Sequence, residues 1–210
     1  TIVELCAVRL PKFFKIDPSQ IQVIAPSKKQ EAGTVNLNRR LQEALNPAAP
    51  EKAELRMGDG VLRVGDRVMQ MRNNYDVVCE RPDTGETSFG VFNGDTATIT
   101  AIDPASQAVT LTFDDRRVAA YPPELLSELD LAYAITVHKS QGNEFPVVVL
   151  SVFDADPRLL SRNLLYTAVT RAKNQLVVVG SDDVFARMVA NNVRHKRYSA
   201  LHVRIRSLFA

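Results

Sequence analysis

The chain has 210 residues, of which 45% are apolar and 24% charged, and it carries a net charge of +2. This composition is ordinary for a soluble globular protein, and the weak positive charge neither demands nor excludes a nucleic-acid partner. The longest apolar stretches have the length of a strand, far short of the roughly 20 residues that span a bilayer, so no membrane partner is expected. Cys6 and Cys79 have neither metal-ligand spacing nor a disulfide framework, which predicts a reducing, cytoplasmic location.

The first part of the chain, residues 1–57, predicts a helix, a strand and a second helix. Thr1–Leu10 is expected to be helical, and the apolar run Ile21–Ala25 is a strand that Pro26 ends. After a polar turn, apolar residues recur at close to 3.6-residue spacing from about Val35 to Leu45, which predicts a helix that stops at Asn46.

Residues 58–123 change character, because short runs with period 2 replace the helical pattern. Examples are Val68–Met71, Thr96–Thr100 and Val109–Phe113, and glycines punctuate the segment. Closely spaced strands with turn signals predict a small antiparallel barrel. Glu80–Glu86 is expected to be an exposed loop tip.

Residues 124–210 return to an alternation of helices and strands. Ala134–Phe145 and Asn163–Lys173 are compatible with helices, and each precedes an apolar strand, Val147–Phe153 and Leu176–Val179 respectively. The tail predicts helices around 184–189 and 198–208. The expected fold is α/β: a parallel sheet flanked by helices, formed by residues 1–57 and 124–210 and interrupted by a β-barrel insertion at 58–123.

Arg171 lies near the end of a predicted helix whose buried stripe would be Leu160, Leu164, Ala168 and Ala172. Its planar, permanently charged fork matches phosphate oxygens, and from a neighbouring domain it can stabilise charge on a transferring phosphoryl group. The alternative is a surface arginine that interacts favourably with the dipole of a helix C-terminus.

A dense polar cluster precedes the strand at Val147. Thr136, His138 and Lys139 can contact a nucleic-acid backbone, while Gln141 or Glu144 can bind a ribose or orient a water. Gly142 permits close approach of the backbone to a ligand. The alternative is a solvated helix end capped by Gly142.

Other polar loops are weaker candidates for a nucleic-acid contact. Ser27 and Lys28 follow the first strand and can meet phosphates, or they form a polar turn. Two barrel loops, Arg72–Tyr75 and Phe92–Asp95, join aromatic to amide and basic groups and can stack bases. Asn93-Gly94 is equally a strong hairpin turn.

Taken together and in order, these segments resemble the C-terminal motor half of superfamily 1 DNA helicases, most closely the RecD-like group that includes the exodeoxyribonuclease V alpha subunit. Thr136–Pro146 is similar to helicase motif V and Leu165–Lys173 to motif VI. Val23–Pro26, with the helix that reaches Asn38, resembles the motif IV region. Gly65–Gln70 and the Phe92–Asp95 turn resemble the SH3-like barrel of that group.

The resemblance implies a second RecA-like domain with an SH3-like insertion. It also implies ATP-driven 5′-to-3′ translocation on single-stranded DNA with duplex unwinding. ATP and Mg²⁺ would be held mainly by an N-terminal RecA-like domain, because no Gly-x-x-x-x-Gly-Lys-Ser/Thr loop occurs in this sequence. The implied partners are single-stranded DNA, that N-terminal domain and, as in part of the group, nuclease or helicase subunits. The isolated chain is expected to hydrolyse ATP negligibly.

The resemblance assigns roles as well. Arg171 would be the arginine finger on the γ-phosphate, Gly142 and Glu144 would contact the nucleotide, and Tyr166 and Thr170 would support them. With the residue-based candidates included, Gln141 joins the nucleotide contacts, and no metal ligand is assigned. The candidate nucleic-acid contacts are Ser27, Lys28, Asn38, Asn73, Asn74, Tyr75, Asn93, Thr136, His138 and Lys139. The alternative function is a non-catalytic nucleic-acid or subunit-binding module derived from a helicase domain.

Overall fold

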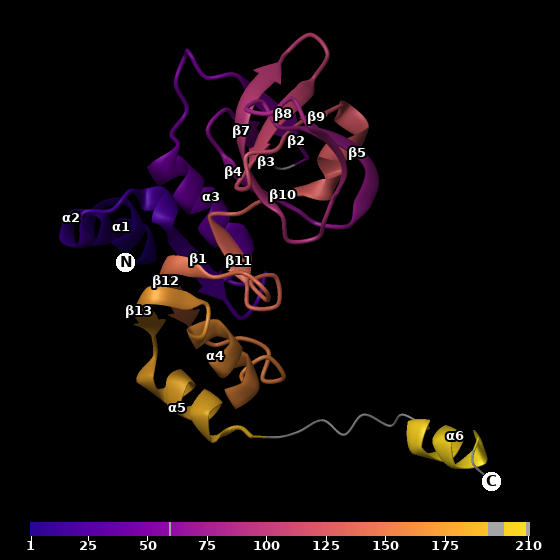
Figure 1. Cartoon of the computed structure of the whole chain (residues 1–210). Helices are drawn as coiled ribbons and strands as arrows, with labels where there is room; N and C mark the ends of the chain where they lie inside the picture. Colours follow the sequence, from indigo (N-terminus) through magenta and orange to yellow (C-terminus); the bar gives the residue numbers. More distant parts are fainter. Residues whose placement is uncertain (59, 193–199, 209–210) are drawn as a thin grey trace.

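A parallel sheet and an antiparallel sheet form the body of the structure (Figure 1). The structure is a computed structural model that describes residues 1–58, 60–192 and 200–208. The parallel sheet has the strand order β11-β1-β12-β13, and each neighbouring pair is parallel. Its strands are β1 (Ile21–Ala25), β11 (Ala134–Thr136), β12 (Phe145–Val152) and β13 (Ala172–Gly180).

Helices cover both faces of the parallel sheet, which explains why β1 and most of β12 are buried. Successive side chains of a strand point to opposite faces. Val147 and Val149 therefore pack with one set of helices: α1 (Ile2–Glu4), a π-helical turn (Leu5–Arg9), α2 (Leu10–Phe14) and α3 (Thr34–Leu45). Val148 and Leu150 pack with α4 (Arg162–Val169) and α5 (Asp182–Ala190) on the other face.

The antiparallel sheet forms a separate core between the segments that build the parallel sheet. Its strand order is β10-β4-β7-β8-β9-β5-β6, and the hairpin β2–β3 packs into the same core. The strands are β2 (Glu54–Met57), β3 (Gly60–Arg63), β4 (Arg67–Gln70), β5 (Asn74–Glu80), β6 (Thr87–Val91), β7 (Thr96–Asp103), β8 (Ala108–Phe113), β9 (Val118–Tyr121) and β10 (Leu129–Leu131). Single 3₁₀ turns lie at Pro18–Gln20 (η2) and Pro123–Glu128 (η3), and α6 is Leu201–Leu208.

The predicted fold class is confirmed, since a helix-flanked parallel sheet carries an antiparallel, barrel-like insertion. Strand pairing alone does not fix the boundaries of the insertion, which were predicted at residues 58 and 123. Antiparallel pairing reaches beyond them on both sides, from Glu54 in β2 to Leu131 in β10. Of the predicted tail helix at 198–208, residues 198 and 199 lie outside the described part of the chain.

The prediction of a helix at Ala134–Phe145 is wrong. Ala134–Thr136 forms β11, and turns follow it up to β12. The run is rich in β-branched residues, which favour strands, and pairing with β1 buries Ala134 and Ile135. The second helix is also shorter than predicted. It ends at Val169, because Ala172 pairs with Phe145 as the first residue of β13.

A buried carboxylate joins the barrel to the parallel-sheet unit. Asp66, between β3 and β4, is fully buried and accepts hydrogen bonds from Gln42 and Asn46 at the end of α3 and from Tyr133 ahead of β11. The backbone N–H of Arg63 donates a fourth bond. These contacts hold the two units in a defined relative position. No helix in the described residues is long and apolar enough to cross a membrane.

Candidate functional site

The candidate site residues separate into two groups at opposite edges of the parallel sheet. Ser27 and Lys28 follow the carboxyl end of β1, and His138 follows that of β11, whereas Gln141–Glu144 and Arg171 precede the amino ends of β12 and β13. Ile24 pairs with both Ile135 and Leu150, and Leu150 is five residues beyond the start of β12. At about 3.3 Å per residue, the two edges are about 17 Å apart along the strands. We call them the carboxyl edge and the amino edge.

Arg171 lies at the amino edge, in the turn between α4 and β13. Its Nε donates to the carbonyl of Thr167 at 3.0 Å, Nη1 to the carbonyl of Asn143 at 2.9 Å, and Nη2 to the Thr170 hydroxyl at 3.1 Å. Three of its five N–H groups are thus used on neutral acceptors. Within the described part of the chain no carboxylate pairs with it, so its positive charge is not neutralised locally.

The other nucleotide candidates lie beside Arg171 along the backbone. Asn143, whose carbonyl holds the guanidinium, is between Gly142 and Glu144, and the N–H of Phe145 donates to the carbonyl of Arg171 at 2.8 Å. Gly142 has a φ of 86°, and a Cβ at this position would meet no atom within 4 Å, so its backbone is open to approach. Glu144 is exposed and pairs with Lys173 at 3.6 Å.

This arrangement is compatible with both interpretations of Arg171 from the sequence. Its bond to Thr167 satisfies a carbonyl of the last turn of α4, as expected of an arginine at a helix C-terminus. It is also a fixed cation with no carboxylate partner among the described residues, beside an exposed glycine turn, which suits an anionic phosphate. The described residues contain no group of three or more His, Cys, Asp or Glu that could hold a metal ion.

At the carboxyl edge, Ser27, Lys28, Thr136 and His138 line one hollow of about 430 Å³, together with Asp156. The chain ends of β1 and β11 meet here because Ala25 pairs with Thr136. Lys28 also forms an ion pair with Asp130 at 3.3 Å, with both side chains about half exposed. Hydroxyl, imidazole and ammonium groups in one hollow are suited to contact a nucleic-acid backbone.

Lys139 links this hollow to the barrel. Its Nζ donates to the carbonyl of Met71 at 3.1 Å and contacts Oδ1 of Asn93. Burial and then the charge of Lys28 lower the pKa of Lys139. Because the ammonium group is occupied by barrel acceptors, Lys139 ties the parallel-sheet unit to the two barrel loops that contain Met71 and Asn93.

From Asn93, which Lys139 contacts, a chain of polar contacts continues through the barrel candidates. The backbone N–H of Asn93 donates to Oδ1 of Asn73 at 2.9 Å, and Nδ2 of Asn73 lies 3.5 Å from the hydroxyl of Tyr75. Tyr75 itself is 67% exposed. The Asn93-Gly94 turn is not a hairpin, because β6 and β7, which it connects, do not pair with each other.

Two candidates face inward. Asn38 is buried, and its side-chain amide bonds the carbonyls of Leu131 and Ala134 and the N–H of Ala134, which fastens α3 to β11. Asn74 donates to the buried carboxylate of Glu128 at 3.1 and 3.2 Å. Both side chains are thus fully engaged in holding the protein together, unlike the exposed members of the group.

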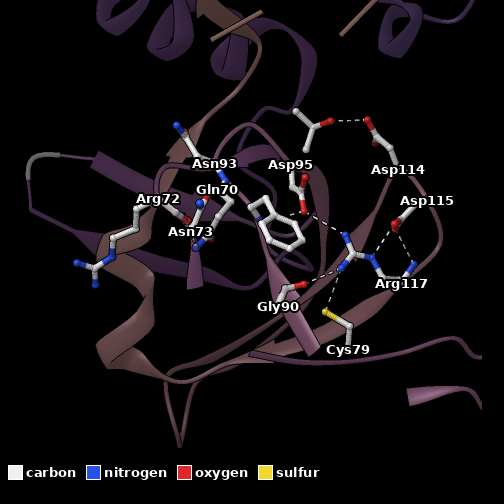
Figure 2. Close-up of polar contacts among 12 residues, drawn as sticks. Gln70, Arg72, Asn73, Cys79, Gly90, Asn93, Asp95, Asp114, Asp115 and Arg117 are labelled. Carbon is white, nitrogen blue, oxygen red and sulfur yellow. Dashed lines mark hydrogen bonds and ion pairs between the residues drawn. The ribbon is translucent and has the colours of Figure 1, made fainter. Parts of the chain in front are cut away.

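Sequence reasoning missed two charged residues that shape the barrel loops, the buried Glu128 and the partly buried Arg117. Glu128 accepts from Gln70 at 2.6 Å and from Arg72 at 2.7 Å in addition to Asn74, which fixes the start of β5. Figure 2 shows Arg117 reaching the carboxylates of Asp95 and Asp115 and the carbonyl of Gly90. The contacts of Glu128, and those of Arg117 with Gly90 and Asp95, have no local sequence signal, because they join segments that are distant in the chain.

Two known families match the chain, one over most of α3 and most of the barrel and the other over part of the parallel-sheet unit. Residues 37–113 match the SH3 domain of ATP-dependent RecD-like DNA helicases. Residues 131–179 match the C-terminal domain of UvrD-like helicases. The second range contains both candidate motifs, Thr136–Pro146 and Leu165–Lys173, and the first contains the barrel loops.

Individual relatives agree with this match. The ATP-dependent RecD2 DNA helicase of Deinococcus radiodurans is 34% identical over 190 residues, which are 90% of this chain and 24% of that protein. The RecBCD enzyme subunit RecD of Mycobacterium tuberculosis is 37% identical over 121 residues, 56% of this chain and 20% of that protein. The chain therefore spans a quarter or less of the length of these relatives.

A solved structure of DNA unwinding at forked double-stranded DNA by two coordinating Pif1 helicases aligns with 99% of this chain and 47% of its own, with a TM-score of 0.51 and 20% identity. At this identity the likeness concerns the fold alone. It agrees with the helix-flanked parallel sheet and the barrel-like insertion described above.

Proposed function

Since the chain belongs to the RecD-like superfamily 1 helicases, as their C-terminal region with its SH3 domain, we propose that it is part of an ATP-dependent 5′-to-3′ DNA helicase. In this proposal the amino edge closes one side of the ATP site, and the carboxyl edge with the barrel guides single-stranded DNA. An N-terminal RecA-like domain holds ATP and Mg²⁺ on the other side, and the isolated chain hydrolyses ATP negligibly.

The observation that supports the proposal best is the position of Arg171. Its guanidinium is anchored by Thr167, Thr170 and Asn143 and lies next to the open turn at Gly142 without a neutralising carboxylate in the described residues. A preorganised cation stabilises charge as it develops on a transferring phosphoryl group. In the proposal, Gln141 and Glu144 on the adjoining turn contact the sugar or a water.

In this proposal the described residues supply phosphate and sugar contacts, and the N-terminal RecA-like domain holds the metal ion. Mg²⁺, when bound with ATP, neutralises charge on the phosphate oxygens. The described residues of this chain bind, orient and shield the nucleotide. Arg171 orients the terminal phosphate, and the turn at Gly142 brings the backbone close to the nucleotide. Residues Ser27, Lys28, Thr136 and His138 would hold the DNA backbone at the other edge.

The test uses Arg171→Ala and Arg171→Lys in the full-length protein, with Arg162→Ala as the matched control. Arg162 is the first residue of α4, the helix that precedes Arg171, and its Nε also donates to a backbone carbonyl, that of Val189. An arginine finger contributes about a thousandfold or more to kcat, so Arg171→Ala should abolish DNA-stimulated ATPase while single-strand binding is retained. Arg171→Lys should also fail, because lysine lacks the planar fork.

If ATPase activity is unchanged in both Arg171 variants, the finger role is refuted. The capping bond to α4 would then account for Arg171. The chain would be better described as a nucleic-acid or subunit-binding module, and the other subunits of a RecBCD-type enzyme, in which its relative RecD is a subunit, would be the partners to test.

A further inference from the structure

The barrel presents an exposed aromatic pair at the end of the polar chain that begins at Lys139. Tyr75 is 67% exposed and Phe92 44%. Their ring centroids are 5.9 Å apart and the ring planes meet at 79°, an edge-to-face arrangement. Exposed rings of this size carry apolar area into water, which is unfavourable unless a ligand covers them.

The turn that carries Phe92 is held rigidly. The N–H of Phe92 donates to Oδ2 of Asp95 at 3.0 Å, and Asp95 is in turn bound by Arg117 at 3.0 Å (Figure 2). The N–H of Gly94 donates to the carbonyl of Gln70 at 2.9 Å. Phe92 is therefore presented in a fixed position without any ligand, and a preorganised surface loses little entropy on binding.

The ring of Phe92 lies against Gly90 of β6. Gly90 has a φ of 92°, and a Cβ at that position would be 3.5 Å from the tip of the Phe92 ring and 3.7 Å from the Cα of Tyr75. The carbonyl of Gly90 accepts from Arg117 at 2.8 Å, so the same arginine fixes both sides of the aromatic pair.

Amide and basic side chains lie beside the pair, and such groups can contact the backbone of a nucleic acid while the rings contact its bases. Asn73 and Asn93 lie directly beside it. Arg72, on the same loop as Tyr75, has a side chain that is 66% exposed and pairs with Glu128 through Nη2.

We propose that Tyr75 and Phe92 form a stacking platform for the unpaired bases of single-stranded DNA. The strand's phosphates pass the hollow at Lys28 and His138, and Lys139 sets the distance from this hollow to the platform through Asn93. The platform accepts any base, because every base has a π face. This inference rests on the proposed function, since it names the base contact of the same DNA path.

The test measures the affinity of the full-length protein for a fluorescein-labelled oligothymidylate. Tyr75→Ala and Phe92→Leu are compared with Phe13→Ala, a matched control on α2 that is 78% exposed and has its own edge-to-face partner, Phe14, at 5.0 Å. Stacking on one aromatic ring gives about tenfold in affinity. Each platform variant should therefore bind about tenfold more weakly, and Phe13→Ala should bind as the wild type does.

A second oligonucleotide of the same length without bases separates stacking from a change in folding. Both platform variants should bind this abasic strand as tightly as the wild type does. The dependence of affinity on salt should keep its slope in the platform variants, because no phosphate contact is lost, whereas Lys28→Ala should reduce the slope by about 1.

Equal losses on normal and abasic strands, or no loss on either, would overturn the stacking platform. In the second case the rings would be available to a protein partner. If Lys28→Ala retains its effect while the platform variants have none, the DNA path of the proposed function survives and this inference alone fails. If the wild type does not bind the oligothymidylate at all, both fail together.

Discussion

The substitution Asp66→Asn should destabilise the whole chain, because this carboxylate joins the barrel to the parallel-sheet unit. Its Oδ1 accepts from Nδ2 of Asn46 at 2.7 Å and from the hydroxyl of Tyr133 at 2.9 Å. Its Oδ2 accepts from Nε2 of Gln42 at 2.5 Å and from the backbone N–H of Arg63 at 2.7 Å. Four donors thus converge on two oxygens that are fully buried.

The size of the effect follows from this geometry. An asparagine keeps one acceptor oxygen but turns an NH₂ group toward two donors, and the backbone N–H of Arg63 cannot turn away. A buried polar group without a partner costs about 1–3 kcal/mol, so two would cost about 2–6 kcal/mol. Relief from burying a charge offsets part of this cost. We therefore expect a net loss of about 3 kcal/mol in the free energy of unfolding.

Urea unfolding followed by circular dichroism measures this loss. At this chain length, about 3 kcal/mol also lowers Tm by about 6–12 °C. Asp83→Asn is the matched control, since Asp83 is an exposed carboxylate at the tip of the β5–β6 loop. If the two variants differ by less than about 0.5 kcal/mol, the four hydrogen bonds do not connect the units in the way described.

Three further predictions concern titrating groups. Burial raises the pKa of Asp66, so the folded state binds more protons than the unfolded state at pH values between the pKa of the unfolded chain and that of the folded protein. The stability that Asp66 contributes therefore falls as pH rises through that window. In urea titrations, the stability difference between wild type and Asp66→Asn should shrink from pH 4 to pH 7. Lys139→Met removes the contacts to Met71 and Asn93, so it should lower the free energy of unfolding by about 1–2 kcal/mol and leave the salt dependence of DNA binding unchanged. A weaker salt dependence with unchanged stability would instead show that Lys139 contacts a phosphate. Burial raises the pKa of Cys6 to about 12 and also raises that of Cys79, so both thiols should react with a disulfide reagent at pH 8 only after unfolding; rapid reaction of the native chain would show that the two cores open.

The elements that could be predicted from the sequence are those with strong local signals. Ile21–Ala25 is a strand with the predicted bounds, since it is a short apolar run closed by proline. The helix predicted from Val35 to Leu45 begins one residue earlier, at Thr34. In both cases the pattern of apolar residues alone specifies the element.

The elements that were missed depend on pairing with distant strands. β11 is only three residues long and exists because β1 provides its hydrogen bonds. The turn at Asn93-Gly94 has the sequence of a hairpin, yet its two strands pair elsewhere, β6 with β5 and β7 with β4 and β8. Pairing between distant segments has no signal in a local pattern, because it is decided by which partners the fold brings together.

The same limit applies to the candidate site. Residue types identified polar loops, but they did not distinguish exposed amides such as Asn73 from Asn38, whose amide is used up on backbone groups. Nor did they indicate Glu128 and Arg117, whose charges fix the barrel loops from within. A side chain's availability for a ligand depends on its neighbours in space, and those come from segments 50 or more residues away in the case of Glu128.

The eight residues between β11 and β12 are the part of the chain where the two proposed activities meet. His138 lines the hollow at the carboxyl edge, Lys139 reaches the barrel, and Asn143 holds Arg171 at the amino edge. Between them Ser140 is fully buried, and its hydroxyl donates to the carbonyl of Val137 at 2.8 Å, which keeps the segment compact. We therefore expect a change in position at one edge to be carried along this short, internally bonded segment to the other. For this reason, substitutions in it should be assayed for both ATPase and DNA binding, because an effect on one does not identify which edge was altered.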